Sequence, residues 1–189
     1  MSKKVDIVSE KIIFDDFFKI KEAEFTHEKY DGSVSPVTRR LSFERNDSVA
    51  AVVYNRITKK LILTEQFRYP TYEKGPGWLL ELVAGSLKLG EDPKLGMIRE
   101  IEEELGYVPV HIEEINSFYV SPGGSSERII LFYAEVENKT SVGGGLVSEN
   151  EDIKIVEFMA GERIENIQDA KTFIGLAWFY NKGPLWKGP

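Results

Sequence analysis

The sequence predicts an α+β fold with α/β/α layers, and three patterns indicate it. Two apolar runs of strand length, residues 49–54 and 61–67, lie close together in the first half of the chain. Apolar residues recur at helical spacing over about residues 93–105 and again over 169–181. Further strand candidates lie before, between and after these two isolated helices. Strands interleaved with few helices are typical of a sheet that helices cover.

The amino-terminal segment, residues 1–45, is expected to be a β segment. Residues 17–30 mix aromatic and charged side chains, and Asp31-Gly32 is a turn signal. We therefore expect a hairpin that returns through residues 37–43.

The remaining strands are expected before and after the first helix in the sequence. The polar residues 55–60 join the two apolar runs, which indicates a buried antiparallel pair. Residues 78–83 are expected to form another short strand that leads into Ala84-Gly85, where the chain must turn. Three more strand candidates follow, at residues 112–119, 129–136 and 153–158.

Both helices have recognisable features in the sequence. Asp92 suits the N-cap of the first helix, Pro93 its first position and Gly106 its end. The apolar face of this helix is expected to consist of Leu95, Ile98, Ile101 and Leu105. The second helix is expected to present Ala170, Phe173, Ile174, Ala177 and Trp178 on one face.

The composition excludes several kinds of site. Of the 189 residues, 42% are hydrophobic, which suffices for a buried core. There is no cysteine and there are only two histidines, so disulfides and Cys/His zinc sites are excluded, and any metal must be bound by oxygen. The net charge of −7 argues against unspecific binding to nucleic acid or membrane. Because the chain starts with charged residues and has no apolar run of membrane-spanning length, we expect a cytoplasmic location.

Three glutamates, Glu100, Glu103 and Glu104, occupy positions i, i+3 and i+4 of the first helix. At 3.6 residues per turn they share one face, which we expect to point away from the apolar core. Each like-charge pair at this spacing destabilises an isolated helix by about 0.2–0.5 kcal/mol. A hard divalent cation such as Mg²⁺ reverses the sign of that interaction. A solvated acidic face is the alternative interpretation of the three glutamates alone.

The wider spacing resembles the signature of the Nudix hydrolases. From Gly85 to Tyr107 the chain has glycine, five residues, glutamate, seven residues, then Arg-Glu-aliphatic-any-Glu-Glu-any-Gly-hydrophobic, and every fixed position matches. The resemblance implies the Nudix fold, an α/β/α sandwich around a mixed sheet, with residues 46–189 as the hydrolase domain. It also implies Mg²⁺ as the cofactor, with Mn²⁺ as the alternative.

The resemblance to the Nudix signature also implies roles for individual residues. The metal ligands would be Glu100, Glu103, Glu104 and the backbone carbonyl of Ala84. Arg99 and Glu91 would orient the ligating carboxylates.

Outside the signature, the chain resembles Nudix enzymes that hydrolyse ADP-ribose and other nucleoside diphosphate sugars. The segments that carry this resemblance are residues 39–45, 65–68, 78–85, 121–128 and 143–153. The resemblance assigns substrate binding to Phe17, Arg40, Arg68, Gly85 and Glu127. It assigns the catalytic base to Glu149, with Glu151 as the nearby competitor. It further implies a homodimer in which the segment 1–45 serves dimerisation and substrate contacts.

Several alternatives stay open on the residues alone. Arg40 and Arg68 could form ordinary surface ion pairs, Phe17 could be a core residue, and the glycines at 143–145 could be a flexible linker. GDP-mannose or UDP-glucose could replace ADP-ribose as the substrate, because the glycine-rich loop also resembles hydrolases of those nucleotides. A module that senses ADP-ribose without hydrolysing it is less favoured. Such modules often lose signature carboxylates, and this chain keeps all of them.

Overall fold

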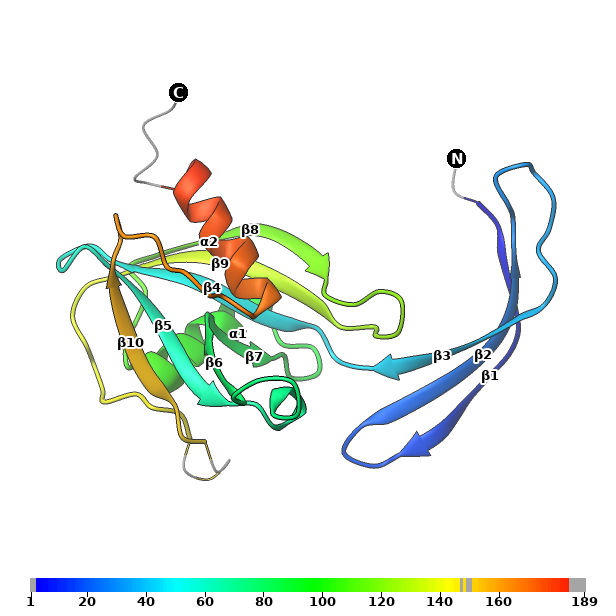
Figure 1. Ribbon diagram of the computed structural model, residues 1–189, viewed down its shortest axis with the longest axis horizontal. Coiled ribbons are helices and arrows are strands. Elements are labelled where there is room, and N and C mark those ends of the chain that lie inside the picture. Colours follow the sequence, from blue (N-terminus) through cyan, green and yellow to red (C-terminus); the bar gives the residue numbers. More distant parts are fainter. Residues whose placement is uncertain (1–2, 147, 149–150, 184–189) are drawn as a thin grey trace. The chain divides into compact units, whose positions relative to one another are not determined.

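The computed structural model describes residues 3–146, 148 and 151–183. The chain divides into two compact units (Figure 1). The amino-terminal unit comprises Met1–Asn46 together with Tyr119–Glu127, and the second unit comprises Asp47–Phe118 and Arg128–Pro189. Among the described residues, no helix has the length and apolar character needed to cross a membrane.

The amino-terminal unit contains a three-stranded antiparallel sheet in the order β1-β2-β3. Its strands are β1 (Val5–Asp15), β2 (Lys19–His27) and β3 (Thr38–Glu44). The expected hairpin is confirmed, since β2 pairs with β3 from Lys19 opposite Glu44 to Phe25 opposite Thr38. The first strand, β1, was not predicted as a separate element. Its side chains are all exposed, so the apolar pattern that marks a buried strand is missing.

The second unit is built on a mixed sheet in the order β10-β5-β4-β9-β8, with β6 paired to β5 and β7 paired to β4. The strands are β4 (Ser48–Asn55), β5 (Lys60–Phe67), β6 (Trp78–Glu81), β7 (Val83–Ser86), β8 (His111–Tyr119), β9 (Arg128–Val136) and β10 (Lys154–Met159). A short 3₁₀ turn, η1 (Tyr69–Thr71), follows β5. The central strand β4 pairs in parallel with β9 and antiparallel with β5, which confirms the buried pair expected from the two apolar runs.

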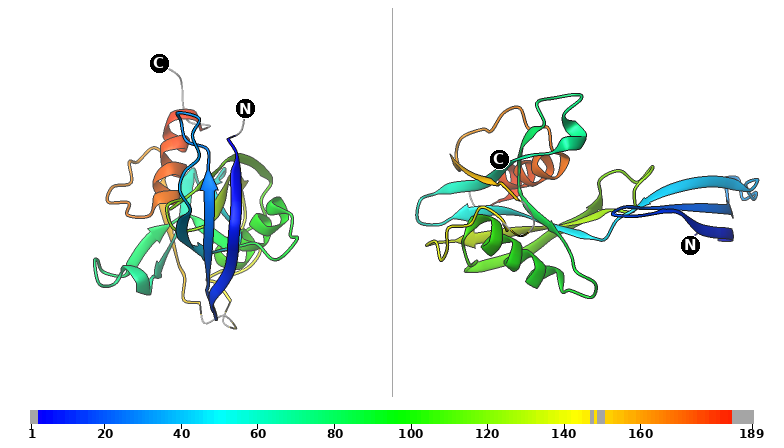
Figure 2. Two further views of the ribbon diagram at one scale, coloured as in Figure 1. Left: turned by 90° about the vertical axis from the view of Figure 1, so that its right-hand side faces the viewer. Right: turned by 90° about the horizontal axis from the view of Figure 1, so that it is seen from below.

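Helices cover both faces of this sheet. They are α1 (Pro93–Glu100), the π-helical turn η2 (Ile101–Leu105) that continues it, and α2 (Ala170–Lys182). Alternate residues of β4 serve the two sides: Val49, Ala51 and Val53 pack with Met97, Ile101 and Leu105, whereas Ala50, Val52 and Tyr54 pack with Leu176 and Phe179. The predicted α/β/α sandwich is therefore confirmed (Figure 2).

The predicted ends of the first helix are confirmed. Asp92 caps α1 by accepting a hydrogen bond from the backbone N–H of Leu95 at 3.1 Å. Gly106 ends the helical segment in the left-handed conformation, with φ of 77°. Within these ends, residues 101–105 form a π-helical turn instead of the regular helix that was expected. Such single wide turns are often found at functional sites.

The predicted helix faces are partly wrong. In α1 the core receives Met97, whereas Leu95 is exposed. In α2 the core receives Leu176 and Phe179, whereas Phe173 and Ile174 are exposed. The buried face of α2 is set by polar and small residues instead of by the large apolar ones. The side chain of Thr172 accepts a hydrogen bond from the backbone N–H of Leu82, the residue between β6 and β7. Gly175 packs against Leu82 and Val52.

The strand predicted at residues 78–83 is in fact two strands, and the turn expected at Ala84-Gly85 is not there. Glu81 pairs with Thr64 of β5, whereas Val83 pairs with Ala51 of β4. The chain therefore crosses from one neighbour to the other at Leu82, and Ala84 and Gly85 extend β7 beside the central strand.

Candidate active site

Arg99 is the organising cation of the signature segment. Its Nε and Nη2 donate to the two oxygens of Glu91 at 3.0 and 3.2 Å, a bidentate pair. Glu91 is itself fixed by the backbone N–H of Lys88 at 2.9 Å. The hydrogen bonds from Arg99 lower the pKa of Glu91, and those to Glu91 raise the pKa of Arg99. These shifts favour the charged form of both groups.

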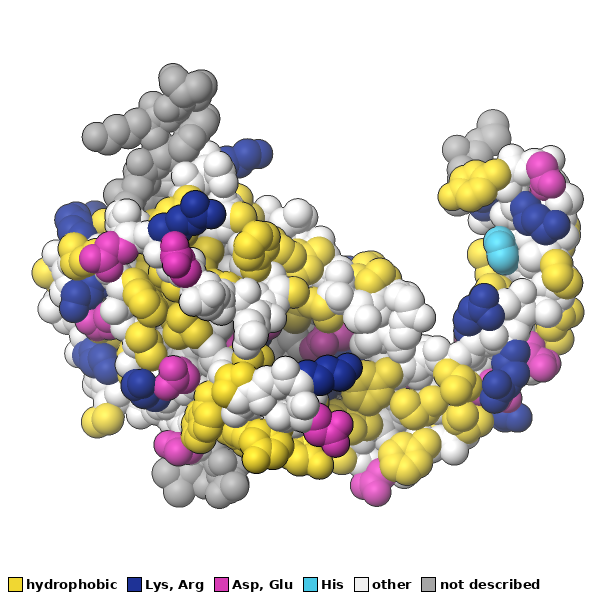
Figure 3. All heavy atoms as spheres, viewed as in Figure 1, with side chains coloured by type: hydrophobic (Ala, Val, Ile, Leu, Met, Phe, Trp, Pro, Cys, Tyr) yellow, Lys and Arg dark blue, Asp and Glu magenta, His cyan; other side chains and the backbone are white. Residues whose placement is uncertain are grey.

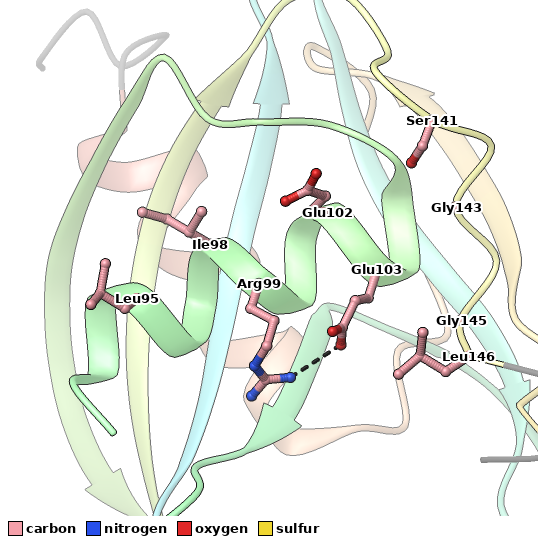
Figure 4. Close-up of a pocket in the computed structure, with 9 residues that line it drawn as sticks. All are labelled: Leu95, Ile98, Arg99, Glu102, Glu103, Ser141, Gly143, Gly145 and Leu146. Atoms are coloured by element: carbon pink, nitrogen blue, oxygen red, sulfur yellow. Dashed lines mark hydrogen bonds and ion pairs between the residues drawn. The ribbon is translucent and has the colours of Figure 1, made fainter. Parts of the chain in front are cut away.

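The same guanidinium holds two of the helix glutamates. Nη1 of Arg99 donates to Oε1 of Glu100 at 2.7 Å and to Oε2 of Glu103 at 3.1 Å. Figure 4 shows Arg99 and Glu103 pointing toward each other from successive turns of the helix. Among residues 3–146, 148 and 151–183, no group of three acidic or histidine side chains is arranged to hold a metal ion as it stands. Two of the helix carboxylates are turned toward Arg99 instead.

Glu100 and Glu104 are buried, which corrects the expectation that the acidic face points away from the core. Glu104 is only 3% exposed. Its Oε2 has no hydrogen-bond partner among the described residues. Burial raises the pKa of Glu104 well above its ordinary value, and the nearby charges of Glu100 and Glu151 add to the effect. Burial also raises the pKa of Glu100, although Arg99 opposes it.

The strand β7 runs against these carboxylates. Gly85 lies opposite Val49 in the pairing with β4, and Ala84 lies opposite Ala50. A Cβ on Gly85 would overlap the carboxylate of Glu100. Only glycine therefore leaves room for a carboxylate at this position.

Arg68 forms an ion pair, but with a buried partner that the sequence did not single out. Its Nε donates to Oε2 of Glu81 at 2.8 Å, and Nζ of Lys171 donates to Oε1 of the same carboxylate at 2.7 Å. Lys171 also contacts Oδ1 of Asp169 at 3.0 Å. Asp169 in turn caps α2 through the backbone N–H of Thr172. The signal that could have revealed Glu81 is a single charge inside the apolar run of residues 78–83, because a buried charge is kept only when it is paired.

The two candidates for the base lie on the loop before β10. Glu149 lies outside the described residues. Glu151 is described: its Oε2 accepts a hydrogen bond from the backbone N–H of Leu146 at 2.8 Å. Its charge raises the pKa of both Glu100 and Glu104, so Glu151 belongs to the electrostatic surroundings of the buried carboxylates.

Three predicted substrate residues lie in the amino-terminal unit. The side chain of Arg40 donates only to the carbonyl of Arg39, at 2.9 Å, and has no ion pair among the described residues. Phe17 is 88% exposed, so it is not a core residue. Its ring and that of Phe18 form an edge-to-face pair with ring centroids 4.7 Å apart. Glu127 lies 3.5 Å from Nη2 of Arg45.

A pocket of about 550 Å³ borders the signature helix. Leu95, Ile98 and Glu102 line one side of it, Arg99 and Glu103 lie at its edge, and the loop from Ser141 to Leu146 closes the other side (Figure 4). Glu100 and Glu104 are not part of this lining. Of the three glutamates expected to bind metal, only Glu103 lines this pocket, which is therefore distinct from the surroundings of the buried Glu104.

The chemistry of the donor set fits a hard divalent cation. Such ions prefer carboxylate and carbonyl oxygens, and these are the groups at Ala84, Glu100, Glu103 and Glu104. A buried carboxylate oxygen without a partner costs free energy, about 1–3 kcal/mol or more for a charged group. A cation beside Glu104 would remove that cost, and it would also offset the repulsion among Glu100, Glu104 and Glu151.

Comparisons of the sequence and of the structure with known proteins identify the family. The model of the NUDIX domain matches residues 44–174. The chain is similar to an ADP-ribose pyrophosphatase of Haemophilus influenzae, with 34% identity over 92% of this chain and 85% of the relative. It is also similar to a GDP-mannose pyrophosphatase of Pectobacterium atrosepticum, with 35% identity over the full length of both chains. The chain therefore belongs to the Nudix family. The fold is shared with a solved structure described as an ADP compounds hydrolase, with a TM-score of 0.69, 18% identity, and coverage of 95% of this chain and 96% of the other.

Proposed function

We propose that this chain hydrolyses the pyrophosphate of nucleoside diphosphate sugars, with ADP-ribose as the leading substrate and AMP and ribose 5-phosphate as the products. The observation that carries the proposal is the buried carboxylate pair of Glu100 and Glu104, with the free oxygen of Glu104, beside an arginine fixed by Glu91. Relatives named ADP-ribose pyrophosphatase and GDP-mannose pyrophosphatase support the substrate class.

Nudix hydrolases generally need a divalent metal ion, and we assign Mg²⁺ here, with Mn²⁺ as the alternative. Glu100, Glu103, Glu104 and the carbonyl of Ala84 would hold it. When bound, a divalent ion neutralises phosphate oxygens and lowers the pKa of water. Arg99 orients Glu100 and Glu103 through its hydrogen bonds, and Glu91 keeps Arg99 in place. Gly85 leaves the space in which the Glu100 carboxylate lies.

The proton of the attacking water needs a base on the loop before β10. We assign this role to Glu149 on the resemblance, with Glu151 as the alternative. The position of Glu151 favours a further role beside the buried carboxylates, because its charge already acts on Glu100 and Glu104. A fourth acidic group there would strengthen the attraction for a cation.

Binding of the nucleotide is assigned to arginines and an aromatic ring. Arg68, held by Glu81, offers a planar cation to a phosphate or a base. Arg40 and Phe17 are available for the same purpose in the amino-terminal unit, since one has no ion pair among the described residues and the other is exposed. Glu127 completes the set that the resemblance assigns to substrate.

We also propose that the protein is a homodimer formed through its amino-terminal unit. The strand β1 exposes several large apolar side chains: Val5, Ile7, Val8, Ile12, Ile13 and Phe14. Figure 3 shows apolar and charged side chains mixed along this unit. A second copy of the chain would cover these exposed apolar side chains, as in an interaction site. The proposal also includes a cytoplasmic location.

The test is hydrolysis of a panel comprising ADP-ribose, GDP-mannose and UDP-glucose, followed by chromatography of the products with Mg²⁺, with Mn²⁺ and with EDTA. We expect AMP and ribose 5-phosphate from ADP-ribose, dependent on the metal ion. The order of kcat/KM across the panel decides between ADP-ribose and the other nucleotide sugars. A protein that binds ADP-ribose but leaves the whole panel intact under all three conditions is a sensor, and the proposal is then wrong.

A further inference from the structure

The loop that precedes Glu151 is attached to the end of the signature helix by its backbone. The N–H of Gly144 donates to the carbonyl of Glu104 at 2.7 Å, and the N–H of Gly145 donates to the carbonyl of Glu103 at 3.2 Å. Just before these glycines, the N–H groups of Thr140 and Ser141 donate to the carbonyl of Gly106, the residue that ends the helix. The last carbonyls of a helix have no partner within it, so this loop supplies the missing donors.

The backbone conformation of the loop favours glycine at three successive positions, and close contacts require it at two of them. Gly143, Gly144 and Gly145 have φ of 71°, 101° and 86°, which side chains disfavour. At Gly143 a Cβ would lie 2.6 Å from the backbone carbon of Leu105 and 2.7 Å from the carbonyl oxygen of Glu104. The loop therefore touches the backbone of the helix directly, which no other residue at position 143 would allow. A flexible linker would not need this fit.

The other end of the loop holds Glu151. The N–H of Leu146 donates to Oε2 of Glu151 at 2.8 Å, and the N–H of Ile153 donates to the carbonyl of Gly144 at 3.3 Å. A Cβ on Gly145 would lie 2.7 Å from that same Oε2 of Glu151. The glycines thus contact the helix on one side and Glu151 on the other.

We infer that Gly143 and Gly145 act as positioning residues, which we call the glycine clamp: they set the distance between Glu151 and the buried carboxylates Glu100 and Glu104. This inference rests on the proposed function, because it concerns the same cation-binding carboxylates. The clamp works by close approach. Figure 4 shows Gly143 and Gly145 passing beside the turn of the helix that carries Glu103.

The three glycines differ in what a side chain would meet, which provides a matched control. Alanine at 144 would meet only the carbonyl oxygen of Ile153, at 3.8 Å, so Gly144→Ala brings the backbone strain of a positive φ without a collision. Gly143→Ala and Gly145→Ala add a collision, the first with helix backbone and the second with Glu151. Gly161 has open space around its Cβ position and no positive φ, so Gly161→Ala is the neutral control.

The experiment compares the four variants with the wild-type chain by three measurements: Mn²⁺ binding by electron paramagnetic resonance, kcat and KM for ADP-ribose, and Tm in EDTA. We expect Gly145→Ala to weaken Mn²⁺ binding at least tenfold and to lower kcat at least tenfold, with KM within threefold and Tm close to that of Gly144→Ala. Gly161→Ala should match the wild type in all three. If Gly145→Ala binds Mn²⁺ within twofold of Gly144→Ala, the inference is wrong.

A double-mutant cycle with Glu151→Gly, which removes both the Oε2 and the Cβ that a side chain at position 145 would meet, separates positioning from general damage to the loop. If Gly145 acts through Glu151, then Gly145→Ala should change Mn²⁺ binding less than twofold once Glu151 is glycine. Equal losses in both backgrounds contradict the inference, even if activity falls. Should Gly143→Ala fail to fold, Gly145→Ala still carries the test, because its collision is with the side chain of Glu151 and not with the helix backbone. A wild-type chain that hydrolyses no nucleotide sugar refutes the proposed function, whereas Mn²⁺ binding continues to report on the clamp.

Discussion

Arg68 donates from its Nε to Oε2 of Glu81 at 2.8 Å, and this carboxylate is 4% exposed at the end of β6. The other oxygen of Glu81 receives Lys171 from the start of α2. A strand residue and a helix residue thus fix an arginine to which the proposed function assigns substrate contact. Buried charges arranged in this way are strongly interdependent.

Removing the charge of Glu81 should cost both stability and substrate affinity. Breaking one member of a buried ion pair destabilises a protein by about 3–5 kcal/mol, and each kcal/mol lowers the Tm of a chain of this size by about 2–4 °C. We expect Glu81→Gln to lower Tm accordingly and to raise the KM for ADP-ribose, because Arg68 loses its anchor. Glu65→Gln is the control, since its pair with Lys154 is exposed and should change Tm by little. An unchanged KM in Glu81→Gln would separate Arg68 from substrate binding.

Glu104→Gln should affect activity and stability in opposite directions. The variant loses a carboxylate assigned to the metal ion, so turnover should fall by at least about two to three orders of magnitude. In EDTA, however, the variant should be more stable than the wild type, because the amide removes a buried charge whose Oε2 has no partner among the described residues. Thermal denaturation with and without Mg²⁺ measures both effects. Near-normal turnover would exclude Glu104 from the mechanism.

The destabilising effect of the buried Glu104 on the metal-free protein should diminish on mild acidification. The pKa of Glu104 is raised in the folded state, so the folded protein holds this proton more tightly than the unfolded chain does. Below the ordinary carboxyl pKa both states are protonated and no penalty remains. Between that value and the raised pKa, the penalty grows as the pH increases. The Tm difference between wild type and Glu104→Gln in EDTA should therefore shrink as the pH falls from 7.5 toward 5, and a constant difference would contradict the shift.

Gly85→Ala should disturb the carboxylates with little effect on the fold. Its Cβ would overlap the carboxylate of Glu100, which lies at the end of a side chain that can rotate away. We expect weaker Mn²⁺ binding and a loss of kcat of about a hundredfold, similar in scale to the removal of one stabilising group at a reaction centre. Gly123→Ala, with open space at its Cβ position, serves as the control. Equal metal binding in the two variants would show that Glu100 is not a ligand.

Light scattering should give twice the 21.5 kDa mass of one chain. A charge placed on β1 should then weaken the dimer, because it would be buried against the second copy. Ile12→Lys tests this, and Leu89→Lys is the control, since Leu89 is fully exposed in the other unit. A monomer under active conditions would rule out the dimer.

Local signals in the sequence were sufficient for the element ends, but not for the packing. Asp92 and Gly106 mark the helix ends through contacts with residues a few positions away, so their roles could be predicted. The buried face of α2 could not be, because it depends on how closely Gly175 approaches Val52 and Leu82 from other parts of the chain. Helical periodicity reports which residues are apolar, and here the exposed Phe173 was misleading.

The candidate site shows the same division. The resemblance assigned Arg99 and Glu91 to orienting the helix glutamates; in the structure Arg99 contacts Glu91, Glu100 and Glu103. The burial of Glu100 and Glu104 was not anticipated, because burying repelling acids contradicts the ordinary rule for a helix face. Such violations are expected at functional sites. The pairing of Glu81 with Lys171 joins strand and helix across much of the chain, so only a three-dimensional structure could reveal it.

The parallel pairing of β4 with β9 constrains the order in which the chain can fold. Ser48 pairs with Ile129 and Asn55 pairs with Val136. The central strand β4 therefore cannot complete its pairing until β9, which is synthesised much later, is available. Contacts this distant along the chain slow folding, because loop closure comes before the stabilising contacts. A nascent chain that ends before residue 128 lacks this partner for the sheet that supports the signature helix. Its apolar strands would stay open to chaperones or to aggregation until β9 emerges from the ribosome.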